Sequence, residues 1–221
     1  MATAVRISFE RHLSQLGDDV LRLGMMARLA VGLGLAALND GNVELAREVI
    51  AEDAAINRLR FSAERQCYSL IATEQPVAGD LRAIVAALTV SADLERIGDH
   101  GKKIAKVALG MAETPRPFFM GAIPRMGELS LSMLDRALQA MAARDVVEAR
   151  SVCEVDDQVD ALYKESFNLF LTRMLEERRA IGTGTHLIQV AHELERVGDR
   201  ATNIAERVIY SVTGELADLN V

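Results

Sequence analysis

The sequence has few residues that interrupt helices or cross-link chains. Among its 221 residues are 4 prolines, 2 cysteines and no tryptophan, and aromatic residues make up only 4%. Cys67 and Cys153 lack the paired spacing of a zinc or redox site, so we expect both to be core residues in a reducing compartment. Half of the residues are hydrophobic, and the composition favours Ala, Leu, Val, Glu and Arg. An all-α fold is therefore expected.

Basic clusters and long apolar runs are also missing. The formal net charge is −7, and no segment has the clustered Lys and Arg that would contact nucleic-acid phosphates. The N-terminal segment carries Arg6, Asp18 and other charges, which excludes the apolar core of a secretory signal. The longest apolar run, Leu29 to Leu38, is about half as long as a membrane-spanning helix. We expect a soluble, cytoplasmic protein with no nucleic-acid partner and no membrane insertion.

The chain contains a long internal repeat. Ala92-Asp-Leu-Glu-Arg-Ile-Gly-Asp99 matches His192-Glu-Leu-Glu-Arg-Val-Gly-Asp199, and Leu45–Val49 matches Glu148–Val152. A repeat of this length indicates a duplicated domain, not an array of short units. We place the domains at residues 1–113 and 122–221, with a linker at 114–121.

Apolar residues recur at spacings of three and four in both halves, which predicts three long helices in each. The expected fold is two tandem three-helix bundles related by a pseudo-two-fold axis. Towards its C-terminal end the first helix has small residues on its packing face, which would let a neighbouring backbone approach closely. Helix-ending and helix-starting signals are predicted at Asn39–Asn42, which closes the first helix, at Pro76 in the first turn of the third, at Asp145 with Glu148 as a capping box for the fifth, and at Gly182–Thr185 between the last two.

The linker contains three apolar residues that look exposed. These are Phe118, Phe119 and Met120, and the two phenylalanines are the only aromatic residues that the pattern places at the surface. Contacts with partner proteins should therefore rest on helix faces with few aromatic anchors, and they should be salt-sensitive because the surface is acidic.

Acidic residues occupy matching positions in the two halves. Heptad positions assigned from the apolar residues place Glu95 with Asp99, and Glu195 with Asp199, one helical turn apart and outside the packing seam. A second pair of carboxylates, Asp156 and Asp160, lies on the preceding helix of the second half. The matching residues in the first half are Asp53 and Asn57, so that half lacks one acid.

Carboxylates in this arrangement could ligate magnesium, manganese or iron. They could equally form a solvated helix face, or be neutralised by the adjacent Arg96 and Arg196. Gly98 and Gly198 interrupt helices beside these acids, which would let another helix or a ligand approach. No phosphate-binding loop, nucleophile elbow, Cys-His pair or Glu-x-x-His di-iron motif is present, so we do not expect an enzyme.

These motifs resemble those of the PhoU family over nearly the whole chain. The resemblance rests on the repeated motifs ending at Asp99 and Asp199, on Ile104-Ala105 and Thr202–Glu206, and on Gln75-Pro-Val-Ala-Gly-Asp-Leu-Arg82. It implies two PhoU domains in a protein that often dimerises. It also implies metal clusters bound at the repeated Glu-x-x-x-Asp motifs, here Glu95 with Asp99 and Glu195 with Asp199. Asp53, Asp156 and Asp160 could complete the two sites, which would hold a divalent metal or an iron or zinc cluster.

The same resemblance implies a regulatory function. Members of the family are accessory regulators of the high-affinity phosphate ABC transporter and negative regulators of the phosphate-starvation response. They are thought to link the transporter ATPase PstB to the sensor kinase PhoR. Two alternatives remain open from the sequence: a metal-dependent or iron-handling helical bundle, and a helical adaptor whose acids form only ion pairs.

Overall fold

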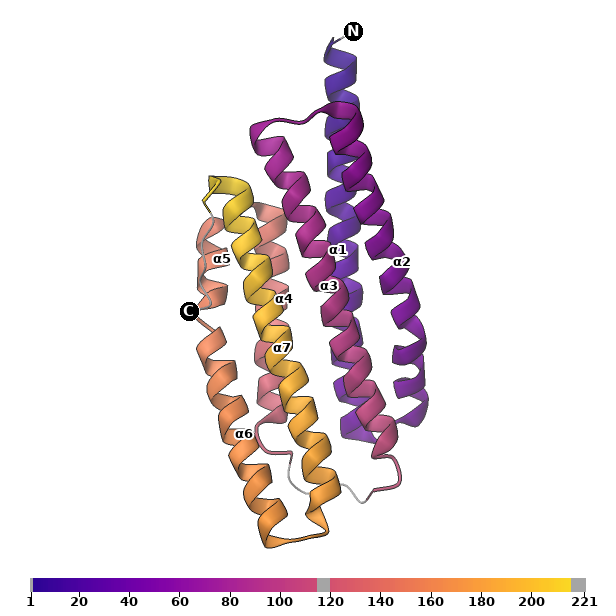
Figure 1. The fold of residues 1–221 in the computed structure, drawn as a ribbon, viewed down its shortest axis with the longest axis vertical. Coiled ribbons are helices and arrows are strands. Elements are labelled where there is room, and N and C mark those ends of the chain that lie inside the picture. The colour runs from indigo at the N-terminus through magenta and orange to yellow at the C-terminus, as the bar shows by residue number, and fades with distance from the viewer. Residues whose placement is uncertain (1, 115–119, 216–221) are drawn as a thin grey trace.

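A computed structural model describes residues 2–114 and 120–215, which contain seven α-helices and no strand. The helices are α1 (Ala2–Asp40), α2 (Val43–Glu74), α3 (Ala78–Gly110), α4 (Ile123–Ala143), α5 (Val146–Cys153), α6 (Asp156–Glu176) and α7 (Ala180–Thr213). The first three form one bundle, and the last four form a second bundle beside it (Figure 1). The all-α architecture expected from the sequence is confirmed.

The helix expected fifth is divided in two. It ends at Cys153 and restarts at Asp156 as α6, so α5 and α6 together take the place that α2 has in the first bundle. Asp156 and Asp157 lie in the first turn of α6, where carboxylates interact favourably with the positive end of the helix dipole. The break therefore turns Asp156 from a mid-helix residue into the first residue of a helix.

Matching residues cap the second helical segment of each bundle. The Asn42 side chain accepts a hydrogen bond from the backbone N–H of Leu45, at 3.0 Å, and starts α2. The Asp145 side chain accepts from Val147 and Glu148 and starts α5, as the sequence predicts. The Glu148 side chain bonds Arg136 and Ser151, which leaves the capping box without its reciprocal half.

Two other helix-boundary predictions are wrong. Gly182–Thr185 lies inside α7, because the turn that separates α6 from α7 falls at residues 177–179. Gly184 is a packing residue: a Cβ there would lie 2.6 Å from Cγ of Met174. Pro76 lies before the first turn of α3, which begins at Ala78.

The small residues of α1 permit close contact with α3. A Cβ on Gly34 would lie 2.8 Å from the carbonyl oxygen of Gly101, and a Cβ on Gly101 would lie 2.5 Å from the carbonyl carbon of Ala30. Both distances are shorter than van der Waals contact, so the two backbones meet at this crossing. Gly98 plays a similar part beside α2, where Ile56 fills the space that a side chain would take. The approach predicted from the glycines is confirmed.

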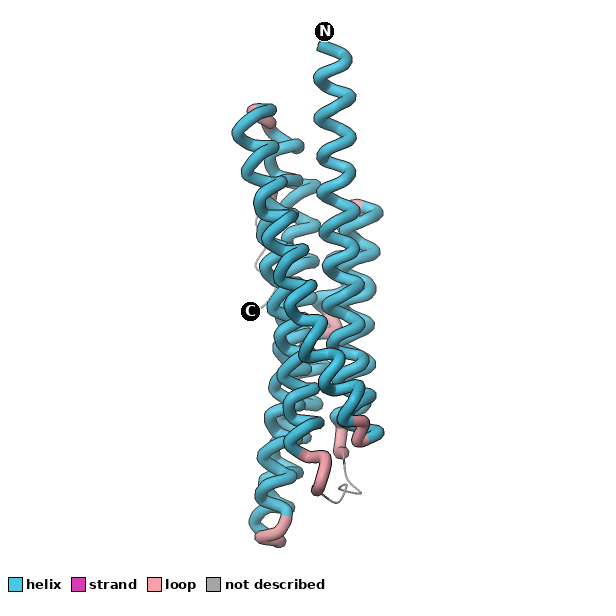
Figure 2. Tube along the Cα trace, turned by 90° about the vertical axis from the view of Figure 1, so that its right-hand side faces the viewer, coloured by secondary structure: helices cyan, strands magenta, loops and turns pink. Residues whose placement is uncertain are grey.

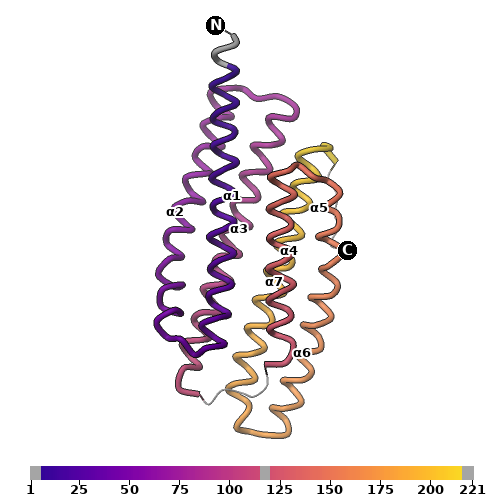
Figure 3. Tube along the Cα trace, turned by 180° about the vertical axis from the view of Figure 1, so that it is seen from behind, coloured from indigo at the N-terminus to yellow at the C-terminus, as the bar shows by residue number. Residues whose placement is uncertain are grey.

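The two bundles pack side by side through α3 against α7 and α1 against α4 (Figures 1 and 3). Figure 2 shows from the side that the helices run roughly along one common long axis. α3 and α7 run antiparallel (Figure 1). Arg28 of α1 and Asp135 of α4 form an ion pair across the same boundary, with Nε 2.8 Å from Oδ1.

Residues 6–40 of α1 are long and apolar enough to cross a membrane by length and composition, but Leu16, Leu23 and other side chains of this helix lie in the core. The predicted domain limits remain a prediction.

The surface carries more aromatic residues than the sequence pattern predicts. Phe61 and Tyr68 of α2 are about half exposed, and Phe167 of α6 is 39% exposed. Met120 is half-buried against the core, and Phe118 and Phe119 lie outside the described residues. Apolar surface is also exposed on α1, where Met25, Leu29 and Leu33 recur once per turn.

Candidate functional site

The repeated acidic motifs lie on α3 and α7, and each faces the preceding helix of its own bundle. In the first bundle a lysine neutralises the acids. Nζ of Lys102 lies 2.7 Å from Oδ2 of Asp53 and 3.8 Å from Oδ1 of Asp99, so one ammonium group bridges two helices. Asn57 donates a further hydrogen bond to Asp53, at 3.2 Å. The hydrogen bond to Asp53 raises the pKa of Lys102 despite partial burial.

Asp53 departs from the solvent-facing position expected for these acids. Only 9% of the residue is exposed, because α2 turns it towards α3. A carboxylate so far from water requires a cationic partner, which Lys102 supplies. The first cluster thus contains its own cation. It does not fit a metal site.

The second bundle has the corresponding acids, with Asp160 in the place of Asn57 as an additional one, and lacks the lysine. Thr202 occupies the position of Lys102, and the cluster comprises Asp156 and Asp160 of α6 with Glu195 and Asp199 of α7. Burial, followed by the charges of Asp199 and Asp160, raises the pKa of Asp156 to about 6. Burial and the charge of Asp199 also raise the pKa of Glu195, although Arg196 opposes the shift. The four carboxylates therefore destabilise one another.

One oxygen of this cluster has no hydrogen-bond partner. Oε2 of Glu195 is buried, and Nδ1 of His192 and Nε of Arg196 are both 3.6 Å away. Arg196 bonds Asp199 instead, at 3.0 Å, so the ion pairing weighed from the sequence accounts for one carboxylate of the four. Gly198 leaves room for the Asp156 side chain, 3.3 Å from where its Cβ would be.

The donor chemistry of the second cluster suits a hard cation, since it offers surplus carboxylates and a buried oxygen without a donor. Within residues 2–114 and 120–215, no three His, Cys, Asp or Glu side chains converge closely enough to ligate one ion as they stand. Side-chain rotation would have to bring Asp156, Asp160, Glu195 and Asp199 together. Metal binding by the predicted residues remains a prediction.

Two polar contacts between the bundles, one of them made by a histidine, were missed by sequence reasoning. Nδ1 of His100 lies 2.5 Å from Oε2 of Glu193, and Arg200 donates to Asp93 at 3.2 Å. Positions 93 and 193, and positions 100 and 200, correspond in the repeat, so the pseudo-two-fold axis relates one pair to the other. Burial raises the pKa of Asp93 even though Arg200 lowers it. Opposite charges at repeat-related positions were the available signal.

Neither cysteine has the environment of a catalytic nucleophile. Burial raises the pKa of both Cys67 and Cys153 to about 11, which keeps them as thiols near neutral pH. Cys67 is fully buried and Cys153 is half-buried, as expected for core residues.

Sequence and structural comparisons identify close relatives. The PhoU domain matches residues 20–108 and again 123–208. Phosphate-specific transport system accessory protein PhoU homologues from Zymomonas mobilis and Caulobacter vibrioides are 38% and 40% identical, each over 94% of this chain and over 88% and 91% of their own lengths. The crystal structure of PhoU from Pseudomonas aeruginosa superposes with a TM-score of 0.90 at 34% identity, covering 94% of this chain and all of that one. PhoU from Streptococcus pneumoniae gives 0.88 at 33% identity, over 95% and 99%.

Proposed function

Because this chain belongs to the PhoU family, we propose that it regulates phosphate transport and represses the phosphate-starvation response when phosphate is plentiful. The supporting observation is that both PhoU domains are present, in a chain that matches accessory proteins over nearly their full length. The family consists of regulatory accessory proteins, and the inert environments of the cysteines agree with a non-catalytic role.

The proposed mechanism is binding to two partners, the transporter ATPase PstB and the sensor kinase PhoR, in the cytoplasm. Two helical faces offer apolar surface for this purpose. One is formed by Met25, Leu29 and Leu33 of α1, and the other by Phe167 and Leu171 of α6. Apolar contacts give affinity, and the acidic surface around them would select basic partner surfaces.

A deletion strain tests the regulatory role. Its alkaline phosphatase activity in high phosphate should be high, and the intact gene supplied in trans should repress it. If the deletion strain keeps the enzyme repressed in high phosphate, the regulatory proposal fails.

Binding assays with purified partners test the mechanism. Leu29→Glu places a charge in the middle of the exposed α1 face, and Leu171→Glu does the same on α6. We expect one of them to weaken binding of PstB or PhoR at least tenfold, while Arg58→Glu on the exposed side of α2 has little effect. Equal binding by all three variants would place the interface elsewhere.

We also propose that the protein forms a homodimer, through one of the same apolar faces. Sedimentation of the wild-type chain should give twice the monomer mass. Leu29→Glu or Leu171→Glu should shift the equilibrium to monomer. A wild-type chain that stays monomeric at high concentration contradicts the proposal.

Metal binding is proposed for the second acidic cluster, at Asp156, Asp160, Glu195 and Asp199, and not for the first. The buried Glu195 oxygen without a donor and the raised pKa of Asp156 support a requirement for positive charge there. A bound divalent ion would supply this charge and crosslink α6 to α7.

Metal content measured by mass spectrometry tests this site. Protein purified without chelator should contain metal, and Glu195→Ala with Asp199→Ala should lose it. Thr202→Lys should also lose it, because it introduces the ammonium group that the first cluster already has. Equal metal content in all three proteins would show that these residues are not ligands.

A further inference from the structure

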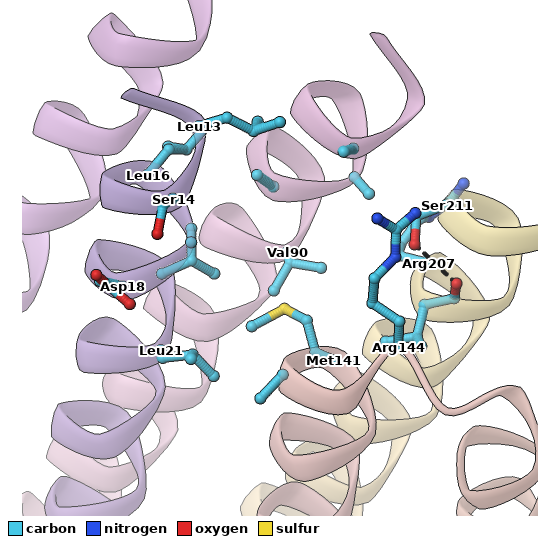
Figure 4. A pocket seen from close by; sticks show the side chains of 17 residues that line it. Leu13, Ser14, Leu16, Asp18, Leu21, Val90, Met141, Arg144, Arg207 and Ser211 are labelled. Carbon is cyan, nitrogen blue, oxygen red and sulfur yellow. Dashed lines mark hydrogen bonds between the residues drawn. The ribbon is translucent and has the colours of Figure 1, made fainter. Parts of the chain in front are cut away.

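A pocket of about 450 Å³ lies between the two bundles, away from the acidic clusters. Its walls are mainly apolar residues of α1, α3 and α4, among them Leu16, Val90 and Met141. Figure 4 shows Arg144, Arg207 and Ser211 together on one side of the pocket, with Leu13, Leu16 and Asp18 across from them. Apolar pockets of this size with a few polar groups at a domain boundary are typical of small-molecule sites.

The arginines at this pocket lack acidic partners. In the part of the chain that the structure describes, no ion pair or side-chain hydrogen bond is formed by Arg144, by Arg207 or by the neighbouring Arg82, whose guanidinium lies against Gly214 at the end of α7. Nε of Arg207 and Nε of Arg82 are buried without an acceptor. Arg207 is close enough to Asp93 to lower its pKa, but Asp93 bonds Arg200. Buried N–H groups without acceptors indicate a missing anion.

The duplication supplies a second pocket for comparison. It has about 230 Å³ and is lined by Leu38, Gly41, Ala108, Met111 and others, which match Met141, Arg144, Val208 and Ser211 in the repeat. Within residues 2–114 and 120–215 no arginine lines it, and the residue that corresponds to Arg207 is Val107. Among the described residues, arginine therefore lines only the larger pocket of the pair.

Arg144 holds a backbone conformation that favours glycine. Its φ is 54°, and Gly41, the matching residue after α1, has φ 62°. The first bundle thus uses the residue that adopts this conformation without strain, whereas the second uses arginine at the rim of the pocket. Because arginine is strained at this position, its presence indicates that the side chain has a function besides ending α4.

We propose that this pocket binds a small amphiphilic anion, with its carboxylate or phosphate head group on Arg144 and Arg207 and its apolar body among Leu16, Val90 and Met141. Guanidinium groups donate paired hydrogen bonds to such head groups, and the pocket walls shield the body from water. Asp18 on the opposite wall repels a second anionic group, which selects molecules charged at one end only.

Calorimetric titration of the full chain with octyl phosphate, below its micelle concentration, tests the proposal. Octyl phosphate should bind, and inorganic phosphate, octanol and octyltrimethylammonium should each bind at least tenfold more weakly. Arg144→Gly should weaken binding of octyl phosphate at least tenfold. Because this variant restores the residue that the first bundle has, it should fold as well as the wild type. Arg207→Gln should have a similar effect, and Arg58→Gln on α2 should have none.

Four results would overturn the proposal. Inorganic phosphate that binds as tightly as octyl phosphate would mean that the apolar body is not recognised, and octanol that binds as tightly would mean that the charge is not. Equal loss with Arg58→Gln would reduce the effect to overall charge. If none of the probes binds, the proposal that the pocket binds a small ligand is refuted, and a partner protein becomes the alternative occupant. None of these results bears on the phosphatase phenotype, so the regulatory proposal stands or falls separately.

Discussion

The two acidic clusters differ in whether a lysine lies among the acids. Lys102 bridges Asp53 and Asp99 in the first bundle, and Thr202 leaves the matching acids of the second without that cation. The first cluster is therefore complete in the protein alone, and the second has a buried oxygen without a donor and an aspartic acid with a raised pKa. The difference teaches that repeated motifs with the same ligand types need not have the same affinity for metal, because a lysine can take the place of the ion.

The largest effect should come from the helix crossing in the first bundle. Gly101→Ala would place Cβ 2.5 Å from the backbone of α1, whereas the matching position of the second bundle already carries Ala201. Overpacking of this kind costs about 3 kcal/mol of unfolding free energy when backbone must move. Urea denaturation measures it. Gly17→Ala, with open space around it, should stabilise the protein by up to about 1 kcal/mol instead. Equal effects would mean that the crossing is not tightly packed.

Exchanging the residues at 102 and 202 should exchange the properties of the clusters. Lys102→Thr leaves the buried carboxylate of Asp53 without its cation and should cost about 2 kcal/mol in the presence of chelator. Adding Mn²⁺ should recover part of the loss if the first cluster then resembles the second. Thr202→Lys should raise the melting temperature in chelator and abolish its response to Mn²⁺. A metal response that both variants retain unchanged would place the ion elsewhere.

The pH dependence of stability should include a contribution from Asp156 of the second cluster. The pKa of Asp156 is raised from 3.8 to about 6, so the folded protein holds this proton more tightly than the unfolded chain. The contribution of Asp156 to the free energy of unfolding therefore falls as pH rises from about 4 to about 6, and the loss is complete above that range.

Asp156→Asn removes this penalty. In chelator it should stabilise the protein by about 1 kcal/mol at pH 8, after allowance for solvent screening, and have little effect below pH 4. Denaturation of variant and wild type at both pH values gives the comparison. A gain that is the same at both pH values would not come from titration of Asp156.

The smallest effects should come from the matching helix caps. Asp145→Ala removes an acceptor of two backbone N–H groups and a charge at the start of α5, and should cost about 1 kcal/mol. Asn42→Ala removes one acceptor from α2 and should cost about 0.5 kcal/mol. Thermal unfolding monitored by circular dichroism measures both. The reverse order would mean that helix length, not cap chemistry, governs the cost.

The repeat and the helical periodicity were sufficient to predict the fold, because both can be recognised from the order of the residues without knowledge of tertiary contacts. They predicted the cap at Asp145 and the close approach at the glycines, but Asn42 was expected only to help close the first helix and not to cap the second. They misread Gly182–Thr185, because a glycine in a helix can reflect either a break or a packing neighbour, and Met174 decides which.

The sites were harder to predict because they depend on groups far apart in the chain. The outward position of Asp99 could be predicted from the spacing, but the burial of Asp53 and its contact with Lys102 depend on how two helices pack. The polar contacts of Asp93 and Glu193 join residues about one hundred positions apart and required the arrangement of the bundles. In each case the missing information was how the helices pack against one another.

The paired contacts between α3 and α7 have a consequence for how such a protein can arise. Each contact joins position 93 of the repeat in one half to position 100 in the other, and the axis exchanges them. A surface that meets its own repeat in this way is isologous and can complement an identical copy. A single-domain ancestor with this face would therefore have formed a symmetric dimer before gene fusion joined the two copies. Fusion then freed each copy to change independently, so that one position could become His100 and the other Arg200.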